Sequence, residues 1–210
     1  METEFAVKNI DIKREENLKF IMQYVNVKLI AVVMVGHSGR FPKKHLASVQ
    51  EGVRLIDVTV KNLRRMGFQV IVYSKYRFPI SVPLLLDEEK WILPSIITLL
   101  RKMNQGIFIF GGDMPLIKRE AVEKMMPYLS HAVVVPRWKN GYLEPLHAYY
   151  TPKIIPVFEK VLNEEKPSLH RAIEACRDVY YVPAEKMPEQ TFFNVNTPED
   201  LNSLRELIKS

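Results

Sequence analysis

A single carboxylate, that of Asp113, follows one of the most apolar short segments of the chain. This segment, residues 107–110, is Ile-Phe-Ile-Phe, and the sequence continues as Gly-Gly-Asp-Met-Pro. Four consecutive apolar residues favour a strand that is buried on both faces, as in a parallel sheet. Ligands of open α/β sheets bind beyond the carboxyl ends of the strands, where Asp113 is expected. Asp113 is therefore a candidate ligand of Mg²⁺, which binds one or two carboxylates together with water and phosphate oxygens. The alternative is that Asp113 caps a helix or belongs to a polar turn.

Small and basic residues follow a second apolar segment, residues 28–35. The sequence after it is Gly-His-Ser-Gly-Arg over residues 36–40, and Lys43 and Lys44 come shortly afterwards. Glycines permit close approach of a ligand, exposed backbone N–H groups bind anions, and basic side chains neutralise phosphate charge. The segment matches neither of the two common nucleotide-loop patterns, G-x-G-x-x-G and G-x-x-x-x-G-K-[ST]. We predict a phosphate-binding loop here, with a solvated basic turn as the alternative.

Strand-like and helix-like segments alternate along the chain, which predicts an α/β fold with a mostly parallel sheet and helices on both faces. Strands are expected at residues 28–35, 68–73, 82–86, 106–110, 132–136, 146–150 and 179–182. Helices are expected at residues 49–65, 92–103, 118–128, 152–163, 168–176 and 198–208. Residues 28–210 are expected to form one domain, preceded by an extension, residues 1–27, whose role the sequence does not reveal.

The composition is that of a globular protein with a basic surface. The 210 residues are 47% hydrophobic and 26% charged, with a formal net charge of +6. Such a charge would steer a phosphate-bearing substrate towards the protein, whereas no recognition motif for nucleic acid accompanies it. One cysteine, Cys176, excludes an internal disulfide framework. No segment has the length of a membrane span or the pattern of a signal peptide, so we expect a cytoplasmic protein.

Three blocks of the sequence carry a resemblance to a known family. The blocks are Met34, Val35 and Gly36 with Ser38, Arg40, Lys44 and Leu46; residues 112–115, Gly-Asp-Met-Pro; and residues 192–201, Phe-Phe-Asn-Val-Asn-Thr-Pro-Glu-Asp-Leu. In these blocks the chain resembles the molybdenum cofactor guanylyltransferases, also called the molybdopterin-guanine dinucleotide biosynthesis protein A family. The blocks occur in the family's order and extend the resemblance over about residues 28–208. The resemblance implies a three-layer Rossmann-like nucleotidyltransferase fold.

The resemblance also implies a reaction: GMP is transferred from GTP to the molybdopterin cofactor, with Mg²⁺ as cofactor and pyrophosphate as the second product. The catalytic residues implied are Lys44 and Asp113, with Asp113 as the metal ligand. The nucleotide-binding residues implied are Met34, Val35, Gly36, Ser38, Arg40, Lys44, Asp87 and Asp113. On the side where the pterin enters, the residues implied are Asn194 and Asn196. Other proteins of molybdenum cofactor biosynthesis are implied as partners, and we expect a monomer.

Two segments depart from the family pattern. Phe41 and Pro42 occupy the positions where the family has Met-Gly, and residues 91–95, Trp-Ile-Leu-Pro-Ser, replace a family segment Gly-Pro-Leu-Ala-Gly. Lys43 remains an alternative to Lys44 as the phosphate-binding lysine. Two other functions stay open: a related nucleotidyltransferase with another base or phosphorylated acceptor, and a catalytically silent nucleotide-binding regulatory protein.

Overall fold

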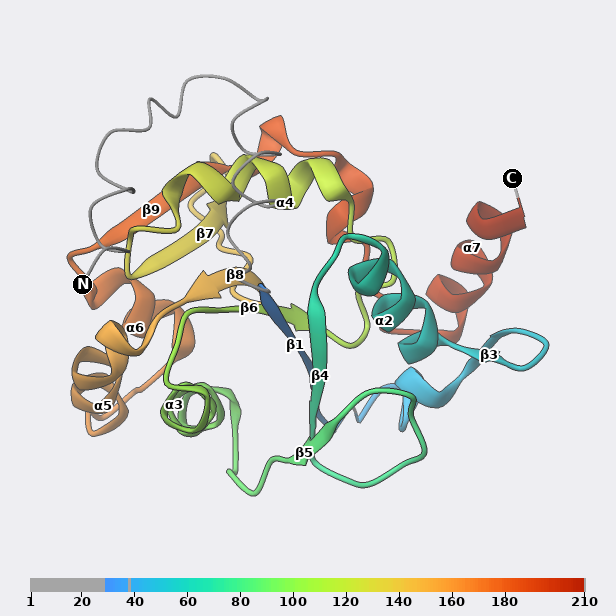
Figure 1. The fold of residues 1–210 in the computed structure, drawn as a ribbon, viewed down its shortest axis with the longest axis horizontal. Coiled ribbons are helices and arrows are strands. Elements are labelled where there is room, and N and C mark those ends of the chain that lie inside the picture. The colour runs from blue at the N-terminus through green and yellow to red at the C-terminus, as the bar shows by residue number, and fades with distance from the viewer. Residues whose placement is uncertain (1–28, 38, 210) are drawn as a thin grey trace, which may run out of the picture.

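Helices cover both faces of a seven-stranded sheet in the computed structural model, which describes residues 29–37 and 39–209 (Figure 1). The strands are β1 (Ile30–Val35), β2 (Ser48–Gln50), β3 (Val53–Arg54), β4 (Gln69–Ser74), β5 (Leu84–Leu86), β6 (Ile107–Gly111), β7 (Val133–Arg137), β8 (His147–Tyr150) and β9 (Val179–Pro183). The helices are α2 (Leu55–Arg65), α3 (Ile92–Met103), α4 (Arg119–Met125), α5 (Ile155–Leu162), α6 (Leu169–Ala175) and α7 (Pro198–Lys209). The expected extension, residues 1–27, and the predicted site residue Ser38 lie outside the described residues.

The strand order across the sheet is β5-β4-β1-β6-β8-β7-β9. β8 runs antiparallel to both of its neighbours, β6 and β7, and the other neighbouring pairs are parallel. The prediction of an α/β fold with a mostly parallel sheet is therefore confirmed. β2 and β3 form a separate two-stranded hairpin.

Alternate residues of the central strands face two different layers of helices. In β1, Ile30, Val32 and Met34 belong to a core cluster shared with α3, α5 and α6. The residues between them belong to a second cluster, shared with α2 and α4. Because side chains of a strand point alternately to opposite faces, a strand covered on both sides must be apolar at every position. This requirement explains the uninterrupted apolar runs of β1 and β6.

One expected helix begins later than its sequence pattern suggested. The prediction of a helix from residue 49 is wrong for residues 49–54, which form most of the β2–β3 hairpin, and α2 starts at Leu55. Gly52 has a φ of +69°, a left-handed conformation that glycine adopts without steric cost and that interrupts a helix. The side chain of Asp57 accepts hydrogen bonds from the backbone and side chain of Arg54, which stabilises the helix start at this later position.

The last helix starts where the sequence predicts. The hydroxyl of Thr197 accepts a hydrogen bond from the backbone N–H of Asp200, and the Asp200 carboxylate accepts from the backbone N–H of Thr197. This reciprocal arrangement is a capping box. The same carboxylate also accepts a hydrogen bond from the backbone N–H of Asn196, so the residue before the helix is held in place as well.

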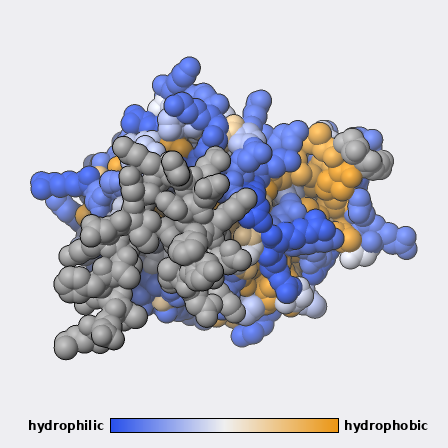
Figure 2. Space-filling model, turned by 45° about the horizontal axis from the view of Figure 1, so that its top comes forward, coloured by the Kyte–Doolittle hydropathy of each residue, from blue (hydrophilic) through white to orange (hydrophobic). Residues whose placement is uncertain are grey.

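On the face drawn in Figure 2, the visible surface of the described residues is mainly hydrophilic. Figure 2 shows blue side chains over much of one face, with apolar surface gathered beside the C-terminal end of the chain. Within residues 29–37 and 39–209, no helix combines the length and apolar character that crossing a membrane requires.

Candidate active site

A cleft of about 660 Å³ lies beyond the carboxyl ends of four neighbouring strands, β5, β4, β1 and β6. Within the sheet, β4 and β5 lie on one side of β1, and the chain then returns to form β6 on the other side of β1. Such a reversal leaves a crevice between the two strands that diverge, here β1 and β6, and ligands of open α/β sheets bind in it. The topology therefore places a ligand site where the loop after β1 meets the acid after β6.

The cleft brings together most of the residues predicted from the sequence. Those that line it are Met34, Val35, Gly36, Arg40, Lys44, Asp87, Asp113 and Asn196. Asn194 is not among the lining residues, and its side-chain amide donates a hydrogen bond to the backbone carbonyl of Phe192 at 3.1 Å. Of the two asparagines expected on the pterin side, the structure thus brings only Asn196 into the cleft.

Lys44 joins two of the predicted residues through its ammonium group. Its Nζ donates hydrogen bonds to Asp113 Oδ2 at 2.6 Å and to Asn196 Oδ1 at 2.8 Å. The three residues are far apart in the chain, since Lys44 begins a short 3₁₀ helix (Lys44–Leu46), Asp113 follows β6 and Asn196 precedes α7. The side chains of Lys44 and Asp113 are 13% and 24% exposed, so both stay accessible from the cleft.

Lys43 has a different environment from Lys44. It is exposed, has a φ of +52° before the 3₁₀ helix and does not line the cleft. The left-handed backbone at Lys43 starts the turn that directs the next residue inwards. Of the two candidate lysines, Lys44 lines the cleft and Lys43 does not.

Backbone contacts fix the position of Asp113. The N–H of Gly112 donates to the carbonyl of Met34, and the carbonyl of Asp113 accepts from the N–H of Val195, both at 2.9 Å. A Cβ on Gly112 would lie 2.9 Å from Val35 Cγ2 and 3.1 Å from the Met34 carbonyl oxygen. Glycine is therefore required for this close approach of the acid-bearing loop to the end of β1.

The donor set at Asp113 fits a hard divalent cation that a phosphate ligand helps to hold. Within the described part of the chain, no group of three or more His, Cys, Asp or Glu side chains could hold a metal by itself. Mg²⁺ commonly needs no such group, because one or two carboxylates are supplemented by water and substrate phosphate oxygens. An all-protein metal cage is thus not the arrangement found here.

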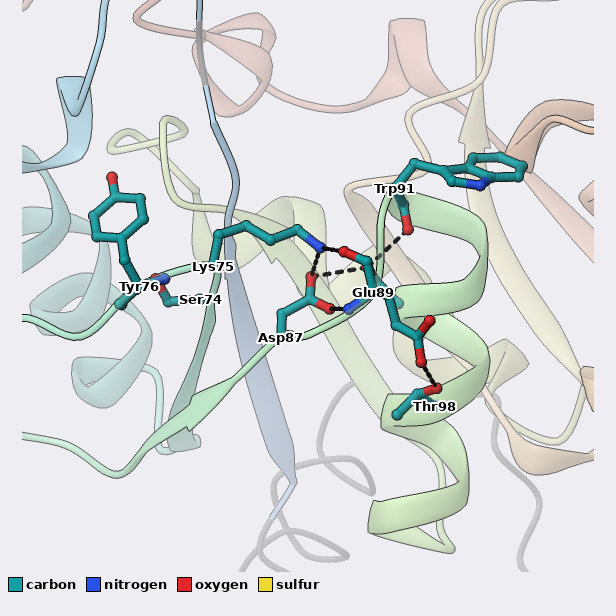
Figure 3. A network of polar contacts seen from close by, with 8 residues as sticks. Ser74, Lys75, Tyr76, Asp87, Glu89, Trp91 and Thr98 are labelled. Carbon is teal, nitrogen blue, oxygen red and sulfur yellow. Dashed lines mark hydrogen bonds and ion pairs between the residues drawn. The ribbon is translucent and has the colours of Figure 1, made fainter.

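Asp87 lies at the other end of the cleft and is held by protein donors (Figure 3). Its Oδ2 accepts from Lys75 Nζ and from the Ser95 hydroxyl, both at 2.8 Å, and its Oδ1 accepts from the backbone N–H of Glu89 at 3.1 Å. The sequence analysis did not identify Lys75 or Ser95, although both line the cleft. Lys75 directly follows β4, so the rule that led to Asp113 could have found it.

His45 is a second residue that the sequence analysis missed. It follows Lys44 directly, lines the cleft and contacts the hydroxyl of Tyr76 through its ring nitrogens. Burial, followed by the positive charges of Arg54 and Lys44, lowers the pKa of His45 to about 4. A neutral His45 anchored on Tyr76 holds the short helix that presents Lys44.

The charged side chains around the cleft favour an anionic ligand. Four cations, Arg40, Lys44, Lys75 and Lys90, line it, together with two anions, Asp87 and Asp113. An excess of charges of one sign in a concave site raises the local concentration of ligands that carry the opposite charge. The cleft therefore suits a polyphosphate.

A mostly parallel sheet that presents a glycine-containing loop, a lysine and one accessible carboxylate at its strand ends defines a nucleotide-binding enzyme of the nucleotidyltransferase class. The chain belongs to the family of MobA-like NTP transferase domains, whose family model matches residues 31–181. The family and the fold class expected from the sequence are both confirmed.

Two relatives agree with this assignment, and one solved structure shares the fold. A protein of Pyrococcus horikoshii named probable molybdenum cofactor guanylyltransferase is 32% identical over 191 residues, which cover 84% of this chain and 98% of that protein. A protein of the same name from Pyrococcus furiosus is 38% identical over 108 residues, which are 49% of this chain and 55% of that protein. The crystal structure of molybdopterin-guanine dinucleotide biosynthesis protein A from Archaeoglobus fulgidus has a TM-score of 0.70 at 23% identity, and the match covers 86% of this chain and 99% of that one.

Proposed function

We propose that the protein transfers GMP from GTP to the molybdopterin cofactor and releases pyrophosphate. The observation on which this proposal rests is the convergence of Lys44, Asp113 and Asn196 at the cleft, where Lys44 bridges the other two side chains. The names of the Pyrococcus relatives support the choice of substrates. We propose the cytoplasm as the location, because it supplies GTP.

Mg²⁺ is the cation that we propose for Asp113. When bound, it would neutralise charge that develops on the phosphate oxygens during transfer. Asp113 would hold it, and phosphate oxygens and water would complete its ligands. The Lys44 ammonium contacts Oδ2 of the same carboxylate and would compete with such a cation for the charge of Asp113.

The chemistry needs no protein nucleophile. An oxygen of the terminal phosphate of the acceptor forms a bond to the α-phosphorus of GTP, the bond between the α-phosphorus and the bridging oxygen breaks, and pyrophosphate leaves with that oxygen. Lys44 and Arg40 would stabilise the negative charge on the triphosphate, and the backbone of residues 34–36 would pack against the nucleotide. Asn196 would orient the Lys44 ammonium. Ser38 would contact the nucleotide and Asn196 the pterin-bearing acceptor, whereas Asn194, which does not line the cleft, would meet that acceptor outside it.

Pyrophosphate release from GTP and purified molybdopterin, measured with Mg²⁺ present, tests the function. We expect turnover with GTP and little with ATP, CTP or UTP. Turnover that favours another nucleotide, or another phosphorylated acceptor, would reject the substrates proposed here.

The variant Asp113→Asn tests the site assignment. It preserves the shape of the side chain but removes the charge that holds the cation, so we expect turnover to fall by about 10²–10³-fold, the range for losing one strong electrostatic contact in a transition state. Thermal denaturation should show that the variant is folded. Unchanged turnover in the folded variant would reject Asp113 as the metal ligand.

A further inference from the structure

The ammonium group of Lys75 is held in place at the end of the cleft opposite Asp113. It contacts Asp87 Oδ2 at 2.8 Å and donates a second hydrogen bond to the backbone carbonyl of Glu89. The side chain of Lys75 is 14% exposed and that of Asp87 is 3% exposed. In Figure 3 Lys75 extends from the end of β4 towards Asp87 and Glu89, and Thr98 of α3 hydrogen-bonds to the Glu89 carboxylate.

One hydrogen-bond donor remains on this ammonium. A lysine ammonium has three N–H donors, and two acceptors for that of Lys75 are found among the described residues. Asp87, in contrast, already accepts from three protein donors. Since Lys75 lines the cleft, this wall offers a ligand an oriented donor more readily than an acceptor.

The strand order indicates which part of a nucleotide would meet this donor. Lys75 follows β4 and Asp113 follows β6, and β1 lies between these strands. Two interstrand spacings separate the two strand ends by about 10 Å, and Asp87 after β5 lies about 5 Å further. A nucleotide whose phosphates lie at Lys44 and Asp113 would thus extend its nucleoside towards Lys75, where Trp91 and Ile92 also line the cleft.

The two common purines differ in what they present to such a donor. Guanine has the acceptors O6 and N7 on one edge, whereas adenine has an amino group at the position of O6. Both purines keep the acceptor N7, so the discrimination arises at position 6, where an ammonium pairs with O6 of guanine but opposes the amino group of adenine. The Asp87 carboxylate balances the charge of Lys75, which reduces the attraction of this ammonium for phosphate.

We propose that Lys75 selects a 6-oxopurine nucleotide by donating a hydrogen bond to the base, and that Asp87 is a positioning residue that orients the Lys75 ammonium. This inference rests on the proposed function, which places the triphosphate at Lys44 and Asp113.

Binding of GTP, ITP and ATP, each with Mg²⁺, to the full chain by isothermal titration calorimetry tests the inference. ITP keeps the 6-oxo group of GTP and lacks only its 2-amino group. Because Lys75→Met alone would leave a buried carboxylate unpaired, the test variant is the double substitution Lys75→Met with Asp87→Asn. We expect the wild-type protein to prefer GTP and ITP to ATP, and the double variant to lose about tenfold or more in affinity for GTP and ITP, with little change for ATP.

Lys90→Met is the matched control, because Lys90 is an exposed cation that lines the same cleft. Its removal should change the affinity for all three nucleotides by the same factor, since each has the same triphosphate. Thermal denaturation establishes that all variants are folded.

Two outcomes would overturn the inference while leaving the proposed function in place. One is an equal loss of affinity for all three nucleotides in the double variant, which would assign Lys75 to the ribose or the phosphates. The other is unchanged selectivity. Failure of the wild-type protein to bind GTP would instead reject the proposed function, and the assignment of Lys75 with it.

Discussion

At the scale of single residues, the main feature of the site is the pairing of its carboxylates with lysine side chains. Lys44 contacts Asp113, and Lys75 contacts Asp87, so each acid that lines the cleft is paired with a lysine. The two pairs differ in accessibility, because the Asp113 side chain is 24% exposed and that of Asp87 is 3% exposed. An incoming cation can reach Asp113, whereas Asp87 is enclosed with its lysine. The two acids therefore suit different tasks, holding a metal and orienting a side chain.

Competition between Lys44 and a metal ion for Asp113 leads to a prediction for Lys44→Met. Removing the ammonium should strengthen Mn²⁺ binding in the absence of nucleotide by up to about fivefold, since a partly exposed ion pair contributes about 1 kcal/mol at most. The same variant should weaken GTP binding, because a phosphate contact is lost. Electron paramagnetic resonance of Mn²⁺, used as a probe in place of Mg²⁺, measures the first effect, and calorimetry the second.

Lys43→Met is the control for this comparison, because Lys43 is exposed and does not line the cleft. It should bind Mn²⁺ as the wild-type protein does. Equal Mn²⁺ affinity in the wild-type protein and Lys44→Met would show that the lysine does not compete for the carboxylate.

At the scale of secondary structure, the ends of elements determine where the functional groups lie. The capping box of α7 holds the backbone N–H of Asn196 as well as its own first turn. The 3₁₀ helix that begins at Lys44 depends on the left-handed backbone of Lys43 and on the contact between His45 and Tyr76. Each functional side chain thus belongs to a turn whose geometry is fixed by hydrogen bonds to its immediate surroundings.

Thr197→Ala tests the connection between the α7 cap and the site. Loss of the capping hydroxyl should lower the free energy of unfolding by about 1 kcal/mol. It should also weaken GTP binding, because Asn196, which orients Lys44, becomes less well held. Urea denaturation and calorimetry measure the two effects. Ser203→Ala, on the exposed surface of the same helix, should change neither quantity. If Ser203→Ala lost as much GTP affinity as Thr197→Ala, the loss in Thr197→Ala would not be due to the cap.

At the scale of the whole molecule, two cores on opposite faces of the sheet leave its carboxyl edge open as the cleft. The core on the side of α2 and α4 borders on a buried histidine, His147, whose ring packs edge-on against Phe110 and Phe192. Neither ring nitrogen of His147 has a hydrogen-bond partner among the described residues. Burial lowers the pKa of His147 to about 3.

This histidine makes stability depend on pH. Its pKa is about 6.5 in the unfolded chain and about 3 in the folded protein, so only the unfolded state binds a proton between these values. The free energy of unfolding should therefore be unaffected by His147 above pH 6.5 and decrease below it, by up to about 1.4 kcal/mol per pH unit. His45, whose pKa is also lowered, should contribute in the same direction down to about pH 4.

Urea denaturation of the wild-type protein and His147→Leu at pH 8, 6.5 and 5 measures this dependence. The variant should lose less stability between pH 6.5 and 5 than the wild-type protein. It should not be strongly destabilised at pH 8, because leucine leaves no buried polar group without a partner. Parallel pH profiles would reject His147 as a source of the acid sensitivity.

Much of the fold and part of the site could be predicted from the sequence alone. The apolar run of β6 indicated a strand covered on both faces, that of β1 indicated another core strand, and the residues after them, Gly36 and Asp113, line the cleft. These inferences depend on side-chain periodicity and on a general rule for the edge of a parallel sheet, neither of which requires knowledge of tertiary contacts. The cap at Thr197 was predictable for the same reason, since it involves residues three positions apart.

Only the tertiary structure decided which residues meet. The choice of Lys44 over Lys43, the pairing of Lys75 with Asp87 and the exclusion of Asn194 from the cleft depend on strand order and on the direction of individual side chains. The antiparallel insertion of β8 between β6 and β7 likewise has no local pattern of its own. The physical reason is that hydrophobic periodicity shows only which face of an element is buried, whereas contacts between distant segments arise when those faces pack together.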